Sequence, residues 1–168
     1  FLAFNPYMHD DEEGLRKPYQ NLLVFLLTKA SSHGLRKKGL TLYAPKYTDE
    51  GNFTTCYERY MDIEEFVNRF ITKESTYVHW ITLTSARDIA NRAAFHLGSC
   101  EDHQLPTLDK NRHVFSFRNG VYCCDTVDDV TGHACDRFYP YEHGYAKGLC
   151  KETCAARYFN SDFNPSWM

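Results

Sequence analysis

Apolar side chains recur at helical spacing over residues 63–71, where they occupy positions i, i+3, i+4, i+7 and i+8 of one helix face. Asp62 stands directly before this run and Glu65 comes three residues later, which is the arrangement of a capping box at the start of a helix. Residues 86–97 repeat the pattern behind a second capping box and are followed by Gly98, a residue type that favours helix ends. The sequence therefore predicts two amphipathic helices.

A third helix is predicted ahead of these two. It begins near Pro18, a residue that is tolerated in the first helical turn, and it fades before Gly34. Residues 22–27 are all apolar, so we expect this helix to be buried around most of its circumference. Residues 22–27 form the longest apolar run of the chain. This run is far shorter than a membrane-spanning helix, which needs about 20 residues. No membrane partner is therefore expected.

Alternation of apolar and polar residues predicts strands in several other places. Residues 40–43 alternate and stop at Pro45, and residues 53–60 form a weaker strand candidate. Residues 77–83 are ambiguous between a strand and a helix. Beyond Pro106 the helical periodicity disappears, and Gly, Tyr, Phe, His and Cys dominate the sequence.

The strongest local signal for a β-hairpin lies in residues 113–122. Their first half is rich in strand formers, and the Asn119-Gly120 step that follows tolerates the positive φ angles of a two-residue turn. Residues 137–141 and 157–159 are predicted to form further short strands.

These elements together predict an α+β fold. We expect residues 1–168 to form a single domain, with a mainly helical part at 16–105 packed on a β-rich, Cys/His-rich part at 106–168. Hydrophobic residues make up 43% of the chain and aromatic residues 15%, which is too rich in large apolar groups for a disordered protein.

Charge and cysteine usage narrow the class of protein further. The net charge of −3 excludes a protein that is basic as a whole. The chain has seven cysteines, an odd number, and no secretory signal, so we expect a reduced intracellular compartment and not a disulfide framework. The chain begins with Phe1 and not with Met, and we expect it to be a fragment of a longer protein.

Residues 29–46 carry lysines and arginines but no acidic residue. Such cations can neutralise phosphates, and nearby tyrosines can stack on unpaired bases, although a solvated loop would look the same in sequence. We expect residues 36–38 to form an exposed turn and the segment to bind single- or double-stranded DNA weakly. The candidate nucleic-acid-binding residues are Lys29, Arg36, Lys37, Lys38, Tyr43, Lys46 and Tyr47.

Most of the cysteines gather near the end of the chain, together with a histidine. Thiolate and imidazole ligands suit a closed tetrahedral zinc site, which could stabilise a segment with a thin core. The alternative is that these residues are reduced, half-buried thiols that behave as small apolar groups. The candidate ligands of a structural zinc are Cys123, Cys124, His133, Cys135, Cys150 and Cys154.

The predicted hairpin at 113–122 resembles the segment just upstream of the motor in the primase–helicases of large nucleocytoplasmic DNA viruses, the poxvirus-type superfamily-3 helicases. Residues 77–84, residues 136–141, and residues 155–159 with Phe163 resemble neighbouring segments of that region, so the similarity covers about residues 55–165. The resemblance implies an accessory domain that packs against the helicase motor, helps to assemble its hexameric ring and guides DNA. The compartment would then be the cytoplasm or nucleus of an infected cell.

The resemblance also implies that ATP hydrolysis and primer synthesis belong to flanking domains, so no catalytic residue is expected in this chain. The sequence contains no G-x-x-x-x-G-K-[ST] loop that would cradle a nucleoside triphosphate. Two other hypotheses stay open at this point. One is a zinc-stabilised protein-interaction module without a nucleic-acid role, and the other is a small thiol- or metal-dependent hydrolase.

Overall fold

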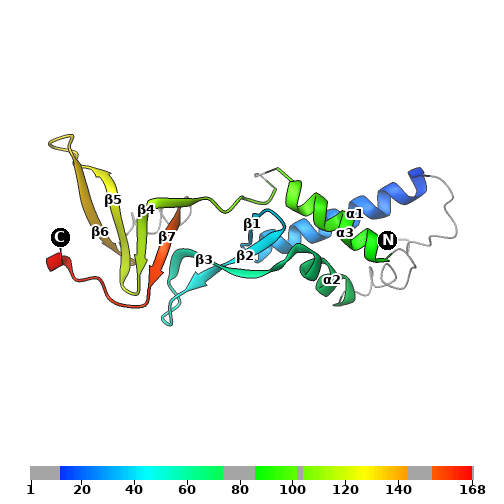
Figure 1. Ribbon diagram of the computed structural model, residues 1–168, viewed down its shortest axis with the longest axis horizontal. Coiled ribbons are helices and arrows are strands. Elements are labelled where there is room, and N and C mark those ends of the chain that lie inside the picture. The colour runs from blue at the N-terminus through cyan, green and yellow to red at the C-terminus, as the bar shows by residue number, and fades with distance from the viewer. Residues whose placement is uncertain (1–11, 74–85, 102–103, 144–152, 168) are drawn as a thin grey trace. The chain divides into compact units, whose positions relative to one another are not determined.

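A computed structural model describes residues 12–73, 86–101, 104–143 and 153–167 (Figure 1). The described residues form α-helices and two β-sheets, which confirms the predicted α+β class. The chain divides into two compact units. Unit 1 comprises Phe1–Ala44 and Arg59–Thr107, and unit 2 comprises Pro45–Glu58 and Leu108–Met168. The predicted element at 77–83 lies outside the described residues.

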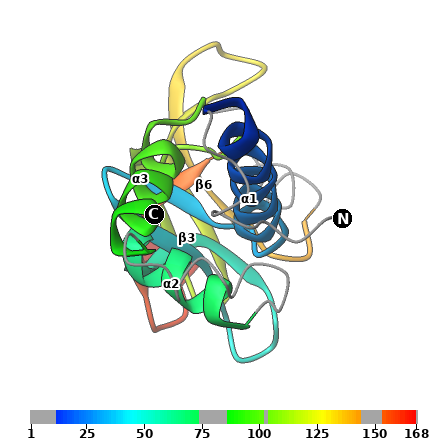
Figure 2. The same cartoon turned by 90° about the vertical axis from the view of Figure 1, so that its right-hand side faces the viewer.

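Unit 1 contains the helices and most of the first sheet. The helices are α1 (Glu12–Ser32), α2 (Ile63–Lys73) and α3 (Ala86–Ser99). The sheet has the strand order β1-β2-β3, with β1 (Arg36–Lys38), β2 (Thr41–Tyr47) and β3 (Phe53–Asp62). Helix α3 packs against both α1 and α2 (Figure 2). The core of unit 1 includes the fully buried side chains of Leu22, Leu26, Leu42, Phe66 and Leu97.

The three predicted helices are confirmed, with two corrections. Helix α1 begins at Glu12, ahead of Pro18. Within its residues 20–32, Leu22 and Leu26 lie on a buried face, whereas Val24 on the opposite side is 62% exposed. Gly98 does not end α3 in a left-handed conformation but lies within its last turn. A Cβ at Gly98 would lie 3.1 Å from the carbonyl oxygen of Gly39, so close packing accounts for the glycine.

The first predicted strand is longer than expected. Strand β2 continues through Pro45 to Tyr47, although the sequence predicted an end at the proline. Strand β1 pairs with β2 only as far as Tyr43, so along that edge Pro45 has no described strand beside it. A proline is tolerated at such an edge because its missing N–H removes no ladder hydrogen bond there.

Unit 2 is built on a four-stranded sheet with the order β6-β5-β4-β7. The strands are β4 (Lys110–Phe117), β5 (Gly120–Val127), β6 (Ala134–Pro140) and β7 (Cys154–Phe159). Neighbours β4–β5 and β5–β6 are antiparallel, whereas β7 runs parallel to β4. The core of unit 2 includes Cys56 of β3 and the buried strand residues Val114, Val121, Cys123 and Ala155. Tyr141, which directly follows β6, belongs to the same core.

The predicted hairpin is confirmed, but its turn is shifted by one residue. Phe117 pairs with Gly120, so the two-residue turn is Arg118-Asn119. None of these residues has a positive φ. Gly120 is instead the first residue of β5, where a Cβ would lie 2.4 Å from the carbonyl oxygen of Tyr139. The sequence signal identified the hairpin correctly but attributed the glycine to the wrong cause.

Thr55 of β3 is the one non-glycine residue with a positive φ, 62°, in the part of the chain that the structure describes. Its side chain is fully buried, and its Oγ1 has no hydrogen-bond partner among the described residues. A left-handed conformation costs a β-branched residue about 1–2 kcal/mol, and an unsatisfied buried hydroxyl costs about 1–3 kcal/mol. Thr55 therefore holds local strain at the β2–β3 tip.

Replacing this residue with glycine, Thr55→Gly, is expected to raise the free energy of unfolding by about 1 kcal/mol. Glycine relieves the strain, and this gain exceeds the cost of about 0.4–1 kcal/mol that comes from the greater entropy of the unfolded chain. Urea denaturation followed by circular dichroism measures the change. The matched control is Thr54→Gly, which should destabilise, because Thr54 Oγ1 donates to the Lys46 carbonyl at 2.8 Å. A Thr55→Gly variant that loses as much stability as this control would contradict the strain assigned to Thr55.

Candidate nucleic-acid interface

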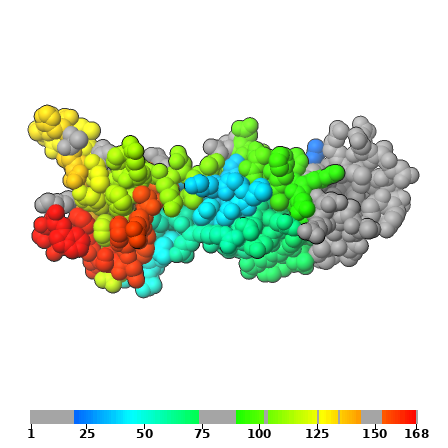
Figure 3. Space-filling model, in the orientation of Figure 1, coloured from blue at the N-terminus to red at the C-terminus, as the bar shows by residue number. Residues whose placement is uncertain are grey.

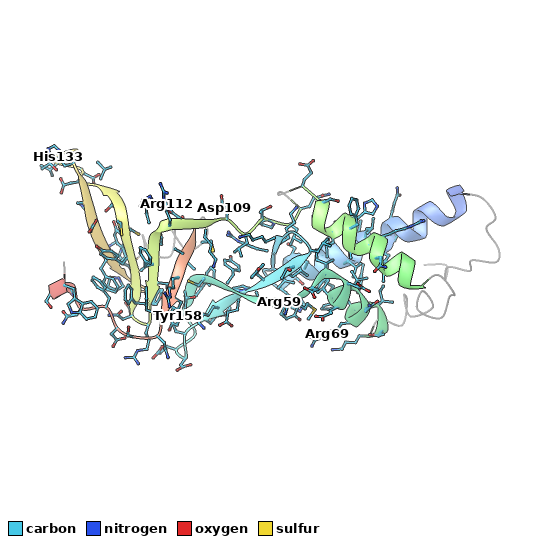
Figure 4. All side chains as sticks on the ribbon, in the orientation of Figure 1. Arg59, Arg69, Asp109, Arg112, His133 and Tyr158 are labelled. Carbon is cyan, nitrogen blue, oxygen red and sulfur yellow. The ribbon has the colours of Figure 1, made fainter. Side chains whose placement is uncertain are left out.

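Unit 2 contains a polar cavity of about 260 Å³ between the tip of the β2–β3 hairpin, the β4–β5 turn and the end of β7. We call it the Lys46 pocket. In the space-filling view the cyan residues of the tip lie beside the orange-red residues of β7 (Figure 3), and Tyr158 is labelled on β7 in Figure 4. The pocket is lined by Lys46, Tyr47, Thr48, Asp49, Arg118, Tyr158 and Asn160.

Local hydrogen bonds shape the tip that carries one wall of this pocket. The Thr48 N–H donates to the Asn52 carbonyl at 2.8 Å, and the Gly51 N–H donates to the Thr48 carbonyl at 2.9 Å. Gly51 has a φ of 86°, a conformation that costs glycine little. The turn therefore ends β2 directly after Tyr47, whose side chain is 59% exposed.

Two cations of the pocket each pair with a carboxylate. Lys46 Nζ lies 2.6 Å from Glu58 Oε1 and 4.9 Å from the centroid of the Tyr158 ring. The hydrogen bond to Glu58 raises the pKa of Lys46, so the amine is charged at neutral pH. Arg118 Nε donates to Asp162 Oδ1 at 2.8 Å, and this contact lowers the pKa of Asp162.

These ion pairs leave the cations available to another anion. Both carboxylates are largely exposed, and water and salt screen exposed ion pairs, so these pairs contribute little to stability. A phosphate group can therefore compete with them. Asp49 lines the same pocket and opposes an anion, so the arrangement suits weak binding.

The structure divides the predicted nucleic-acid-binding residues between the two units. Lys46 and Tyr47 line the pocket in unit 2, and the others belong to unit 1. Lys29 Nζ lies 5.6 Å from the centroid of the Phe25 ring, and Lys38 is exposed. The residues in unit 1 are Lys29, Arg36, Lys37, Lys38 and Tyr43.

The expected exposed turn at 36–38 is wrong. These residues form strand β1, and the middle residue, Lys37, points into the unit with only 6% of its surface exposed. Its Nζ donates to the Cys100 carbonyl, and its backbone N–H donates to the Pro106 carbonyl at 2.9 Å. Strand alternation buries the middle residue of three, so Lys37 cannot present its charge to a phosphate.

Sequence reasoning missed five of the pocket residues: Thr48 and Asp49, which directly follow Tyr47, and the more distant Arg118, Tyr158 and Asn160. The last three lie far from Lys46 in the sequence, and the pairing of β7 with β4 brings Tyr158 and Asn160 beside Arg118 at the β4–β5 turn. Arg118 alone had a local signal, because an arginine beside a predicted hairpin turn is expected to be exposed.

The candidate zinc ligands lie at different depths in unit 2. Cys123 and Cys154 are buried, Cys124 and Cys135 are half-buried, and His133 is exposed at the β5–β6 turn (Figure 4). Cys123 faces the core, and its neighbour Cys124 therefore lies on the opposite face of β5. Cys150 lies outside the described residues.

Within the described ranges, no three or more potential ligands gather at one place. A structural zinc stays a prediction, and metal analysis of the purified protein tests it. Cys56 was not among the predicted ligands, yet it packs in the same core as Cys123. Burial is the main cause that raises the pKa of the Cys56 thiol to about 12, so this side chain behaves as a small neutral group.

Unit 1 has a larger cavity of about 560 Å³ between α1 and α3. Its lining combines the apolar residues Leu23, Val24, Leu27 and Leu97 with Cys100 and with polar residues, namely Gln20, His96, Ser99, Glu101 and Gln104. The sulfur of Cys100 donates to the Leu97 carbonyl at 3.0 Å. This cavity is bigger than the Lys46 pocket but has no pair of cations, so we favour the smaller, polar pocket as the candidate site.

The chain matches no known family model and none of the curated proteins. No helix among the described residues is long and apolar enough to cross a membrane.

Proposed function

We propose that this chain is a non-catalytic accessory module that engages single-stranded DNA through the Lys46 pocket. One observation carries the proposal: the pocket places two cations, Lys46 and Arg118, beside two tyrosines, Tyr47 and Tyr158. Cations combined with aromatic rings are the means by which proteins bind single strands without reading their sequence.

Three of these side chains have a defined part in the proposed contact. Lys46 and Arg118 bind consecutive phosphates in place of Glu58 and Asp162. The exposed ring of Tyr47 stacks on an unpaired base. Contacts of this kind favour any unpaired strand over a particular sequence, because every base has a face that can stack.

The resemblance of residues 113–122 to the pre-motor region of viral primase–helicases supplies the wider setting of the proposal. In that setting the module precedes a helicase motor, supports assembly of its ring and passes the strand toward it, inside an infected cell. The motor and primase activities belong to flanking domains.

The test is the salt dependence of DNA binding. Fluorescence anisotropy with a labelled oligothymidylate should show weak binding at low salt. A plot of log K against log salt concentration should have a slope of about −1.4, because two neutralised phosphates contribute about −0.7 each for a single strand. Absence of binding at low salt, or an affinity that does not change with salt, would show that the pocket does not hold a strand by its phosphates.

A further inference from the structure

The end of the chain covers the outer face of the unit 2 sheet. Residues 160–167, which we call the strap, follow β7 and lead Phe163 onto this face, where it is 7% exposed. Its ring stacks on Tyr122 at 5.0 Å and on Phe138 at 4.7 Å between centroids, and its edge contacts Phe117 at 5.1 Å. We call these three rings the aromatic site.

The strap is held at the β4–β5 turn, and the same turn carries a cation of the Lys46 pocket. The Arg118 N–H donates to the Ser161 carbonyl at 3.0 Å, and the Arg118 guanidinium pairs with Asp162. Asn119 bonds the Phe163 backbone twice, accepting from its N–H at 2.8 Å and donating to its carbonyl at 3.0 Å. Arg118 thus belongs both to the pocket and to the strap's attachment.

Asp162 and Phe163 together present the chemical groups of a nucleotide. A carboxylate sits on the Arg118 guanidinium as a phosphate would, and the next residue inserts a planar ring into a stack as a base would. We propose that Asp162-Phe163 occupies a nucleotide subsite, and that a single strand displaces it by placing a phosphate on Arg118 and a base among Phe117, Tyr122 and Phe138.

This inference rests on the proposed function and adds a regulation to it. Single-stranded DNA can bind the subsite only when the strap is open. Its apparent affinity is therefore the intrinsic affinity multiplied by the fraction of molecules with an open strap. Arg118 couples the two events, because a phosphate that takes its guanidinium also removes the ion-pair partner of Asp162.

The first test weakens the strap without changing any ring. Asp162→Asn removes the ion pair to Arg118, and it is expected to bind the labelled oligothymidylate about threefold to fivefold more tightly than the wild type, since an exposed ion pair is weak. Asp129→Asn is the matched control, because it removes one negative charge from the exposed β5–β6 turn of the same unit. It should leave the affinity within about twofold of the wild type, as salt screens a distant surface charge.

The second test weakens the stacking. Phe163→Leu keeps an apolar side chain in the aromatic site but removes the ring, and it is expected to raise the affinity about tenfold. If this variant does not fold, Asn119→Ala takes its place, because it removes both side-chain hydrogen bonds to the Phe163 backbone and leaves Arg118 and Asp162 unchanged. Tighter binding by Phe163→Leu, or by Asn119→Ala in its place, with Asp129→Asn unchanged, supports the inference. A wild type that binds as tightly as this variant overturns the strap's role alone, because Asp162→Asn by itself also frees Arg118 for a phosphate. If neither the wild type nor any variant binds the oligothymidylate, both the inference about the strap and the proposed function fail.

Discussion

Replacing Lys46 and Arg118 together by glutamine is expected to weaken binding of single-stranded DNA more than about tenfold at low salt, since both phosphate contacts and the counterion release that accompanies them are lost. Glutamine keeps much of the length of both side chains and introduces no new negative charge beside Glu58 or Asp162. The loss should appear in fluorescence anisotropy, and the slope of log K against log salt concentration should fall toward zero, because no phosphate is neutralised.

The matched control removes the same charge from unit 1. Arg36→Gln with Lys38→Gln alters the two outer residues of β1 and leaves the buried Lys37 in place. This double variant should bind DNA as the wild type does. If it loses binding while the Lys46 and Arg118 variant retains it, the basic segment of unit 1 holds the strand and the Lys46 pocket does not. Circular dichroism should confirm that all variants are folded.

Gly120→Ala is expected to destabilise the protein by about 2–3 kcal/mol, which is the upper range for overpacking a core. The added Cβ would lie 2.4 Å from the Tyr139 carbonyl oxygen, 2.6 Å from Phe138 Cζ and 2.9 Å from Pro140 Cα. Two of these three atoms are backbone atoms of β6, so the clash cannot be relieved by a rotamer change and must move strand β6 against β5. Denaturation by urea measures the loss.

Gly132→Asn is the control for the loss of a glycine as such. Gly132 has a φ of 69°, and a Cβ there would meet no atom within 4 Å. Asparagine tolerates this left-handed conformation, so the variant should change stability by less than about 1 kcal/mol. Equal stability of the two variants would mean that β5 and β6 do not approach each other as closely as the structure has them.

The helices and the hairpin could be predicted because their signals are local. The apolar face of residues 63–71 became the buried face of α2, and the strand formers of 113–122 became β4 and β5. The role of Gly120 could not be predicted in this way. Its constraint comes from Tyr139 on another strand, whereas the sequence pattern could show only the turn beside it.

The candidate site could be predicted only in part, because it is assembled from distant segments. The basic segment at 29–46 included Lys46 and Tyr47, yet local sequence could not show that Lys37 faces inward. It could not show either that Arg118 and Tyr158 complete the pocket, since the parallel pairing of β7 with β4 brings them there. The exposure of a charged residue depends on which face of a strand is covered, and tertiary packing decides this.

The location of the bound DNA decides whether the Lys46 pocket holds it. Single-stranded DNA containing 5-iododeoxyuridine can be crosslinked to the protein by light, and the modified residues can be identified by mass spectrometry. Crosslinks are expected in unit 2, at Tyr47 or Tyr158 of the Lys46 pocket. Crosslinks confined to unit 1, for example at Tyr43, would contradict this expectation.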